Sequence, residues 1–257
     1  MVKNNVVIVT QARIGSSRFP EKVLKPLGTA TLLGVHLERL KKVKNADTII
    51  VATTFEEKSS QIIAIANELG VNVFQGSEND VLDRFYQAVK GHQPKFVVRV
   101  TSDCPLIDPK LVEEIIQMVI DQDLDYGSNV LIEAFPDGQD AEVFKFEALE
   151  KAWKEAKLNS EREHVTPFIR NNSDYKGGTL FKANNFNSSQ NFNHIRMTVD
   201  EPSDLETIQI LIDKLGTDEN WMTYTQYIIE NINLFKNQDT TRNEGYLKSI
   251  KEDSHEQ

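Results

Sequence analysis

Four cationic side chains follow a short apolar run near the start of the chain. The run is Val6–Val9, and the cations after it are Arg13, Arg18, Lys22 and Lys25. Arginine offers a planar fork of donors that matches phosphate oxygens, and lysine is a mobile point charge. The same loop contains small residues whose backbone N–H groups could turn towards an anion, namely Gly15, Ser16 and Ser17. We therefore interpret the loop as a polyphosphate site. The alternative is a solvated turn whose cations offset an acidic surface.

Two aspartates are candidates for a magnesium site. Asp103 and Asp200 each follow directly on a stretch that we expect to be a strand. Mg²⁺ usually binds proteins through one or two carboxylates together with substrate phosphates. The alternative is that both aspartates cap helices, because Pro105 and Pro202 each lie two residues further on. Together with the cation loop, the two aspartates favour a metal–triphosphate site.

Strand and helix patterns alternate along the first half of the chain and must position these side chains. Apolar runs predict strands at residues 6–9, 47–53, 71–74 and 96–100. Apolar residues at helical spacing predict helices at 31–44, 62–69, 81–89 and 109–119, with Gly70 ending the second. This alternation predicts an α/β fold with a mostly parallel central sheet that helices cover on both faces.

Ligands of such sheets bind at the carboxyl ends of the strands, at a switch point in strand order. Thr53 and Thr54 follow the second strand, Thr101 and Asp103 follow the fourth, and Asp200 follows a strand expected at 194–199. We expect all of them to lie at one edge of the sheet, beside the cation loop. The loop matches neither GxGxxG nor GxxxxGK[ST], which disfavours dinucleotide binding and a Walker-type site.

The second half of the chain is less regular. Residues 127–193 are rich in polar and turn residues, and we interpret them as an inserted substrate or dimer region of a single domain that spans residues 1–237. Residues 194–199 predict a further strand, and apolar spacing from residue 205 predicts closing helices. Residues 238–257 are charged and lack apolar periodicity, so we expect a polar, mobile tail.

Composition excludes several classes of protein. The chain has 257 residues, a net charge of −10 and one cysteine, Cys104. The negative charge argues against general nucleic-acid binding, and a single cysteine allows no internal disulfide. No stretch approaches the ~18 apolar residues of a membrane span, and the first residues lack the features of a secretion signal. We expect a cytoplasmic protein with small-molecule ligands.

Residues 12–24, ARIGSSRFPEKVL, resemble the ARxGSxRxPxKxL signature of the cytidylyltransferases that activate acidic sugars. The resemblance runs from about Val6 to Leu205 and is greatest to the SpsF branch, the spore coat polysaccharide proteins related to CMP-KDO synthetase. Supporting stretches are VATT (51–54), GSENDVLDR (76–84), RVTSDCPLIDP (99–109), DGQDAEV (137–143) and SEREHVTP (160–167). Ser102 and Thr54 depart from the residues of CMP-KDO synthetases and favour the SpsF branch.

The resemblance implies a Rossmann-like nucleotide-diphospho-sugar transferase fold, a homodimer, and transfer of CMP from CTP to a sugar hydroxyl. It implies a catalytic role for Lys22, Arg13 and Asp103, and Mg²⁺ held by Asp103 and Asp200. The residues implied to bind the nucleotide are Ala12, Arg13, Gly15, Ser16, Arg18, Lys22, Thr53, Thr54, Asp80, Arg84, Thr101 and Asp103. A glycosyltransferase of similar architecture and a non-catalytic nucleotide-binding protein are the alternatives.

Five further residues are open to two interpretations. Asp140 and Glu142 alternate, so in a strand both would face one side, towards the sugar or towards solvent on an exposed edge strand. His164 could contact substrate or serve only as a structural hydrogen-bonding group. Asp80 and Arg84 could equally form an ordinary helix start with local ion pairs. No residue distinguishes cytosine from another base.

Overall fold

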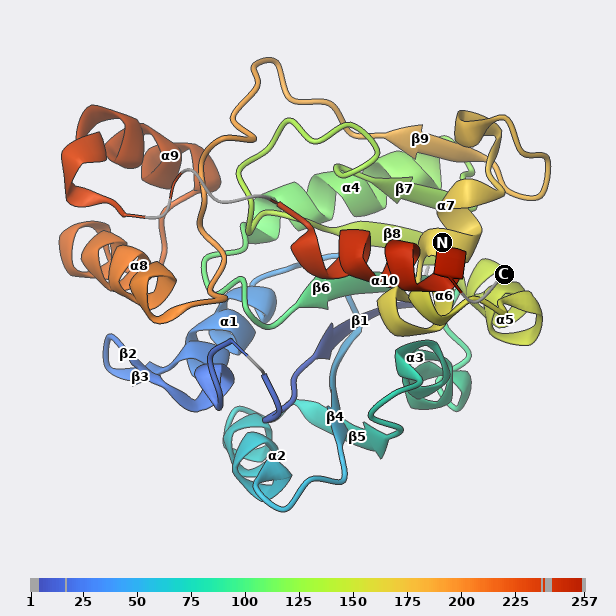
Figure 1. The fold of residues 1–257 in the computed structure, drawn as a ribbon, viewed down its shortest axis with the longest axis horizontal. Coiled ribbons are helices and arrows are strands. Elements are labelled where there is room, and N and C mark those ends of the chain that lie inside the picture. The colour runs from blue at the N-terminus through green and yellow to red at the C-terminus, as the bar shows by residue number, and fades with distance from the viewer. Residues whose placement is uncertain (1–4, 17, 237, 239–241, 256–257) are drawn as a thin grey trace.

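In the computed structural model, which describes residues 5–16, 18–236, 238 and 242–255, the chain is built around a seven-stranded sheet (Figure 1). The strands are β1 (Val6–Gln11), β2 (Pro26–Leu27), β3 (Ala30–Thr31), β4 (Thr48–Thr54), β5 (Asn72–Gly76), β6 (Phe96–Thr101), β7 (Tyr126–Ser128), β8 (Glu142–Lys145) and β9 (Ala183–Asn185). The large sheet has the order β5-β4-β1-β6-β8-β7-β9, and β2 pairs with β3 in a separate ribbon. Only β8 runs antiparallel to its neighbours in the large sheet, so the predicted mostly parallel sheet is confirmed.

Helices connect and cover these strands. They are α1 (Leu32–Leu40), α2 (Ser59–Glu68), α3 (Val81–Lys90), α4 (Pro109–Asp121), α5 (Phe146–Glu155), α6 (Asn159–His164), α7 (Pro167–Asn171), α8 (Pro202–Leu215), α9 (Trp221–Glu230) and α10 (Glu244–His255), with 3-10 turns η1 (Lys22–Leu24), η2 (Asp174–Lys176) and η3 (Ile232–Leu234). Among the described residues, no helix combines the length and apolar character needed to cross a membrane.

The core lies on both faces of the sheet because successive residues of a strand point to opposite sides. Val7 and Val9 of β1 pack with α3 and α5 on one face. Val6 and Ile8 pack with α4 and the end of α1 on the other face. A further apolar cluster joins α8 and α9 to residues of α1 and of the segment 192–199. The expected coverage of the sheet on both faces is confirmed.

The centre of the sheet contains the switch point. β1 lies between β4 and β6, and the chain passes from β1 to β4 and β5 before it returns to β6. The loops after β1 and β6 therefore lie side by side, where the Ser102 hydroxyl donates a 2.7 Å hydrogen bond to the Gln11 carbonyl. This is the position at which parallel sheets bind ligands.

Two predictions about the second half of the chain need correction. Residues 194–199 do not form a strand; they make a single bridge, between Arg196 and Asp137. Ile195, Met197 and Val199 are buried against α8 and α9, so the apolar alternation serves that cluster rather than the sheet. Residues 127–193 are not merely inserted, because with Tyr126 they provide β7, β8 and β9 of the central sheet. A role of this region in substrate or dimer contacts stays a prediction.

The expectation of a polar tail beyond Gln238 also differs from the structure. Residues 244–255 form α10, which lies against α6 across the front of the sheet in Figure 1. The residues of α10 that are buried, Ser249 and Asp253, are polar, so no apolar period marks this helix in the sequence.

Candidate active site

The ammonium group of Lys22 lies at the centre of the predicted site. Its Nζ donates to Asp103 Oδ2 at 2.9 Å, to Asp200 Oδ1 at 2.9 Å and to the Val199 carbonyl at 2.8 Å. All three donors of the ammonium are thereby used. The structure thus brings together three predicted residues that the sequence separates by up to 178 positions.

Local structure explains how the two carboxylates reach Lys22. Asp103 lies in the turn after β6, and Asp200 lies in the segment before α8. The residue that caps α4 is Asp108, whose side chain accepts hydrogen bonds from the backbone of the first turn, and the residue that caps α8 is Glu201. The alternative that Asp103 and Asp200 are helix caps is therefore wrong, and both carboxylates are available for chemistry.

The Lys22–Asp103 pair remains charged. Burial alone would raise the pKa of Asp103, but the Lys22 ammonium and the Thr101 hydroxyl outweigh it and hold the pKa well below the ordinary value. Burial would lower the pKa of Lys22, but Asp103 and Asp200 raise it above its usual range. At neutral pH the cluster is therefore a cation held between carboxylates.

Asp200 is also surrounded by two guanidinium groups. Arg18 approaches its Oδ1 at 3.1 Å, and Arg196 approaches its Oδ2 at 3.1 Å. The Arg196 side chain is 8% exposed and also binds Asp137 and Asp204, so it fixes the carboxylate. Arg18 is 45% exposed and also pairs with Glu244 at 3.4 Å. Arg196 was not predicted. Its signal was a cation between Ile195 and Met197, in a segment of alternating apolar residues.

The rest of the cation loop lies beside two glutamates. Arg13 is half exposed and lies 3.8 Å from Glu78. A side chain at Gly15 would place its Cβ 2.9 Å from Glu56, whose carboxylate accepts the N–H of Ile14. The N–H of Ser16 is used by the Ile14 carbonyl, so it does not form the predicted anion nest, and Ser17 lies outside the described residues.

The remaining predicted nucleotide residues lie beneath or beside this loop. Ala12 donates its N–H to the Ala52 carbonyl, and Thr53 and Thr54 are buried at the end of β4. The Thr101 hydroxyl contacts the Cys104 thiol. Burial raises the pKa of that thiol, which fits the absence of a nucleophilic role for it.

Asp80 and Arg84 belong to the start of α3. Asp80 caps α3 and pairs with Arg162, so its carboxylate is already occupied. Arg84 is buried, and burial lowers its pKa to about 10. The structure therefore favours the helix-start interpretation of Asp80 and leaves the nucleotide role of both residues a prediction.

The three predicted substrate residues surround one cavity of about 80 Å³. The side chains that line it are Arg99, Val130, Asp140, Glu142, His164, Thr166, Arg170, Asn243 and Tyr246. Glu142 is 3% exposed and β8 lies inside the sheet, so the exposed-edge alternative for Asp140 and Glu142 is wrong. Arg99 opens the stretch 99–109 quoted for the resemblance but was not assigned to the site, and neither Arg170 nor Tyr246 was predicted.

Two guanidinium groups, those of Arg99 and Arg170, and one carboxylate, that of Glu142, line the inner part of this cavity. The Glu142 carboxylate is bound by Arg99 at 2.5 Å and by the hydroxyls of Tyr126 and Thr166, each at 2.6 Å. Burial would raise the pKa of Glu142, but Arg99 and then Arg170 outweigh it and hold the pKa below the ordinary value. Burial lowers the pKa of His164 to about 4, so its ring is neutral at pH 7. Two guanidinium groups thus serve one carboxylate.

His36, which the sequence analysis missed, supports the turn that holds Asp103. Its Nδ1 donates to the Cys104 carbonyl at 2.9 Å, because a carbonyl can only accept, and its Nε2 therefore accepts from the Thr10 hydroxyl at 2.9 Å. The residue is fully buried, and burial lowers its pKa to about 4. A neutral imidazole thus joins β1 to the Asp103 turn.

The depressed pKa of His36 predicts a loss of stability in acid. The unfolded chain binds a proton at His36 below about pH 6.5, whereas the folded chain resists it down to about pH 4, so stability falls as pH decreases through this window. We expect His36 to account for about 2 kcal/mol of the stability lost between pH 7 and pH 5. Urea unfolding at both pH values should show a smaller pH effect in His36→Gln than in wild type. The exposed His92→Gln is the control, and an unchanged pH effect in His36→Gln would contradict the assignment.

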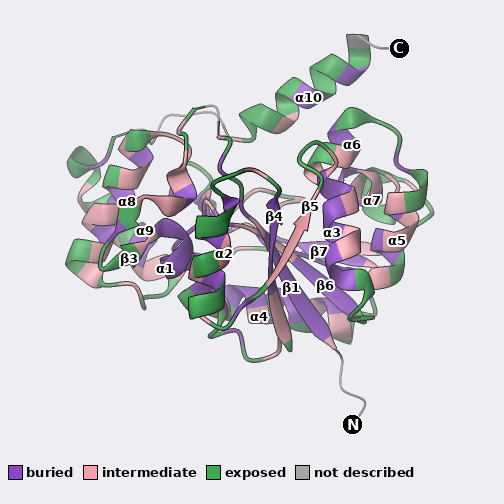
Figure 2. Ribbon diagram, turned by 90° about the horizontal axis from the view of Figure 1, so that it is seen from below, coloured by how far each residue is buried: buried purple, intermediate pink, exposed green. Residues whose placement is uncertain are grey.

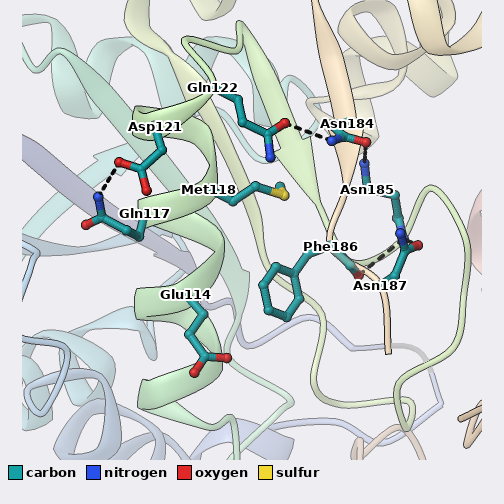
Figure 3. Close-up of a pocket in the computed structure, with 9 residues that line it drawn as sticks. All are labelled: Glu114, Gln117, Met118, Asp121, Gln122, Asn184, Asn185, Phe186 and Asn187. Atoms are coloured by element: carbon teal, nitrogen blue, oxygen red, sulfur yellow. Dashed lines mark hydrogen bonds between the residues drawn. The ribbon is translucent and has the colours of Figure 1, made fainter. Parts of the chain in front are cut away.

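A larger open depression of about 530 Å³ lies elsewhere, between α4 and the segment 184–187 (Figure 3). Its side chains largely bond to one another, as Gln122 does with Asn184 and Gln117 with Asp121. It contains none of the predicted site residues. We therefore place the chemistry at the Lys22 cluster and the adjoining 80 Å³ cavity.

Comparisons with known proteins agree with this geometry. The family model described as cytidylyltransferase matches residues 6–240. The spore coat polysaccharide biosynthesis protein SpsF of Bacillus subtilis is 33% identical over 233 residues, which cover 83% of this chain and 88% of SpsF.

Two solved structures are similar. A cytidylyltransferase of Leptospira borgpetersenii superposes with a TM-score of 0.85 at 32% identity, over 93% of this chain and 99% of that one. A CMP:2-keto-3-deoxy-manno-octonic acid synthetase complexed with CTP superposes with a TM-score of 0.62 at 18% identity, over 82% and 99%, and so shares the fold. The chain therefore belongs to the cytidylyltransferase family, within which it is SpsF-like, and it is a nucleotidyltransferase with a Rossmann-like fold.

Proposed function

We propose that the protein transfers CMP from CTP to a hydroxyl of an acidic sugar and releases pyrophosphate, for the synthesis of a surface polysaccharide. The observation that carries this proposal is the Lys22 ammonium held between Asp103 and Asp200 at the switch point of the sheet. The sugar oxygen forms a bond to the α-phosphorus, and the bond from that phosphorus to the bridging oxygen breaks. Pyrophosphate takes the electron pair, and the hydroxyl proton passes to solvent.

The cations of the first loop suit a triphosphate. Arg13 and Arg18 are about half exposed. Arg13 is held by an ion pair with Glu78 at 3.8 Å, and Arg18 by ion pairs with Asp200 at 3.1 Å and Glu244 at 3.4 Å. Exposed ion pairs of this kind contribute little, so both guanidinium groups can turn to a ligand at small cost. Phosphoryl transfer depends mainly on positioning and on neutralising developing charge, which Arg13, Arg18 and Lys22 would supply.

Mg²⁺ fits the same cluster. Asp103 and Asp200 offer hard oxygen ligands that converge on one cationic group. Among the described residues there is no group of three or more His, Cys, Asp or Glu side chains that could hold a metal alone. Two carboxylates with ligands completed by phosphate oxygens and water are the usual arrangement for Mg²⁺. When bound, the ion would neutralise phosphate charge, with Asp103 and Asp200 as its protein ligands.

The adjoining cavity favours an acidic acceptor. Arg99 and Arg170 together carry one more charge than Glu142 can balance, and Asp140 is already paired with Arg242. The Nε atoms of Arg99 and Arg170 are buried without a hydrogen-bond partner in the structure. A buried cation without a full set of partners is costly, so a carboxylate on the acceptor would be stabilised here.

The proposal is tested by calorimetry with CTP, UTP, ATP and GTP, each with and without Mg²⁺. We expect CTP to bind most tightly and its affinity to increase with Mg²⁺. Preference for another triphosphate would keep the reaction class and overturn the choice of base. Binding of a nucleotide sugar and of no triphosphate would instead favour the glycosyltransferase alternative, which membership of the cytidylyltransferase family now disfavours.

Arg170→Gln tests the acidic acceptor. The variant keeps hydrogen-bonding capacity but removes the charge, so we expect the KM for 3-deoxy-manno-octulosonate to rise about tenfold or more, with the affinity for CTP unchanged. Pyrophosphate release and CTP calorimetry provide the two measurements. An equal KM in Arg170→Gln and wild type would remove Arg170 from acceptor binding.

We also propose that the enzyme is a cytoplasmic homodimer. The single buried cysteine suits a reducing compartment, and the resemblance of the sequence to the acidic-sugar cytidylyltransferases supports the dimer. Light scattering on the purified chain distinguishes a dimer of about twice 29.3 kDa from a monomer.

A further inference from the structure

Helix α10 lies outside the region that the cytidylyltransferase family model matches. That match ends at residue 240, and α10 begins at Glu244. Figure 2 shows α10 on the side of the molecule to which the arrow of β5 points, beyond the carboxyl ends of the strands. This helix therefore stands over the edge of the sheet that carries the active site.

The segment 242–255 forms one wall of the 80 Å³ cavity. Two of the lining side chains, Asn243 and Tyr246, come from it. The Tyr246 ring lies 5.1 Å from the Arg170 guanidinium carbon and 5.1 Å from the His164 ring centre. Tyr246 thus covers Arg170 and His164, which line the cavity opposite the segment 242–255 and would contact an acceptor there.

Polar contacts hold the segment in place. The Ser249 hydroxyl donates to Glu163 at 2.7 Å and lies 3.1 Å from His164 Nε2. Arg242 binds Asp140 and donates to the Phe135 carbonyl at 3.0 Å. Each such bond contributes little net stability, because water replaces it when the segment leaves.

Apolar burial contributes little to this docking. The buried residues of α10 are Ser249 and Asp253, whereas Leu247 and Ile250 are 47% and 38% exposed, as the mostly exposed colouring of α10 in Figure 2 reflects. Within the described part of the chain, no α10 residue belongs to an apolar core cluster. Elements with few buried apolar contacts open at a low free-energy cost.

The cavity under the docked segment is too small for a sugar. Its volume is about 80 Å³. Pockets for small organic ligands measure roughly 300 Å³ or more. Movement of the wall formed by residues 242–255 would give an acceptor the room that this cavity lacks.

We propose that residues 242–255 form a lid over the acceptor pocket, with Tyr246 as its acceptor-contacting residue. The docking contacts and the size of the cavity support the lid. That the molecule under the lid is a sugar acceptor rests on the proposed function. In the structure the lid is closed. It opens by exchanging the contacts of Arg242, Glu244, Ser249 and Asp253 for water, and admits the sugar to Arg99 and Arg170.

Thiol labelling tests the lid without any ligand. Thr166→Cys places a thiol on the cavity wall, at a position that is 1% exposed, and the natural Cys104 is buried, so the chain without Thr166→Cys is the blank. Ser249→Asp adds a carboxylate beside Glu163 and should undock the lid by repulsion. Ser254→Asp makes the same substitution at an exposed position of α10 and is the matched control.

We expect iodoacetamide to label Thr166→Cys at least tenfold faster with Ser249→Asp, and within twofold of the parent rate with Ser254→Asp. Tyr246→Ala, which removes the ring contacts with His164 and Arg170 and the interaction of the Tyr246 hydroxyl with Arg170, should also accelerate labelling. Equal rates in all four chains would overturn the lid. Circular dichroism confirms that each chain is folded.

Steady-state kinetics test the role of Tyr246. With 3-deoxy-manno-octulosonate and saturating CTP, Tyr246→Ala should raise the acceptor KM at least tenfold, with kcat within threefold of wild type. An unchanged KM would remove Tyr246 from acceptor contact. If wild type releases no pyrophosphate with this sugar, the acidic-acceptor assignment and the acceptor role of Tyr246 both fall. The labelling rates test whether the lid opens, and they do so whether or not this sugar is a substrate.

Discussion

Lys22→Met is expected to lower kcat by at least a hundredfold while the fold survives. The ammonium is the group that can move between the carboxylates Asp103 and Asp200 and the phosphates of a bound nucleotide. Removing one preorganised charge from a transition state of this kind costs on the order of 3 kcal/mol. Methionine keeps the length and apolar stem of the side chain, so packing around the stem changes little. Pyrophosphate release measures the loss, and circular dichroism checks the fold.

The same variant separates catalysis from metal binding. In the absence of nucleotide, Lys22 occupies the oxygens that Mg²⁺ would need, so the ammonium and the metal compete. We expect Lys22→Met to bind Mn²⁺ about tenfold more tightly than wild type without nucleotide, because two carboxylates lose their cation.

Lys25→Met is the control for both measurements. Lys25 lies in the same loop, over the Phe19 ring, and should leave turnover and Mn²⁺ affinity within about twofold of wild type. Turnover near the wild-type rate in Lys22→Met would exclude Lys22 from the reaction. Weaker Mn²⁺ binding in that variant would contradict the competition.

The sequence predicts those parts of the fold that have a strong local pattern. β1, β4 and β6 are strands of six or seven residues built around shorter apolar runs, and the predicted start of each lies within one residue of its observed start. β7 and β9 have three residues each, and the run Ala183–Asn185 contains two asparagines, so neither has a period to detect. Short strands such as these form because neighbouring strands pair with them, which is a long-range effect.

The same distinction applies to the site. Lys22, Asp103 and Asp200 could be predicted because each lies beyond a buried stretch. Sheet topology brings the first loop and Asp103 to one edge, whereas Asp200 follows residues 194–199, which pack against α8 and α9 and form no strand. His36 and Tyr246 act through contacts with residues far away in the chain, and their neighbours in sequence carry no sign of this. Arg196 binds the nearby Asp200 and Asp204 and also Asp137, and the contact with Asp137 is the long-range one. The helix that carries Tyr246 was missed because its inner face is polar, and hydrophobic periodicity detects only apolar faces.

Asp103→Asn is expected to abolish the activity that depends on Mg²⁺, with a loss of a hundredfold or more in kcat. The amide keeps the shape and one hydrogen bond to Lys22 but loses the charge that the metal requires. The pKa of Asp103 lies well below its ordinary value, so the wild-type carboxylate is ionised throughout the neutral range. The lower kcat of Asp103→Asn would therefore reflect the loss of a charge that wild type carries at the pH of the assay. The residual activity should no longer saturate with Mg²⁺ in the range that saturates wild type.

Asp213→Asn, at an exposed position of α8, is the matched control, and its Mg²⁺ titration should overlay that of wild type. The two variants together separate a metal ligand from a general effect of charge, since both remove one negative charge from a chain of net charge −10. A normal Mg²⁺ titration of Asp103→Asn at reduced kcat would show that Asp103 acts only by holding Lys22. In that case Asp200 would be the remaining protein ligand, and Asp200→Asn, not Asp103→Asn, would lose the response to Mg²⁺.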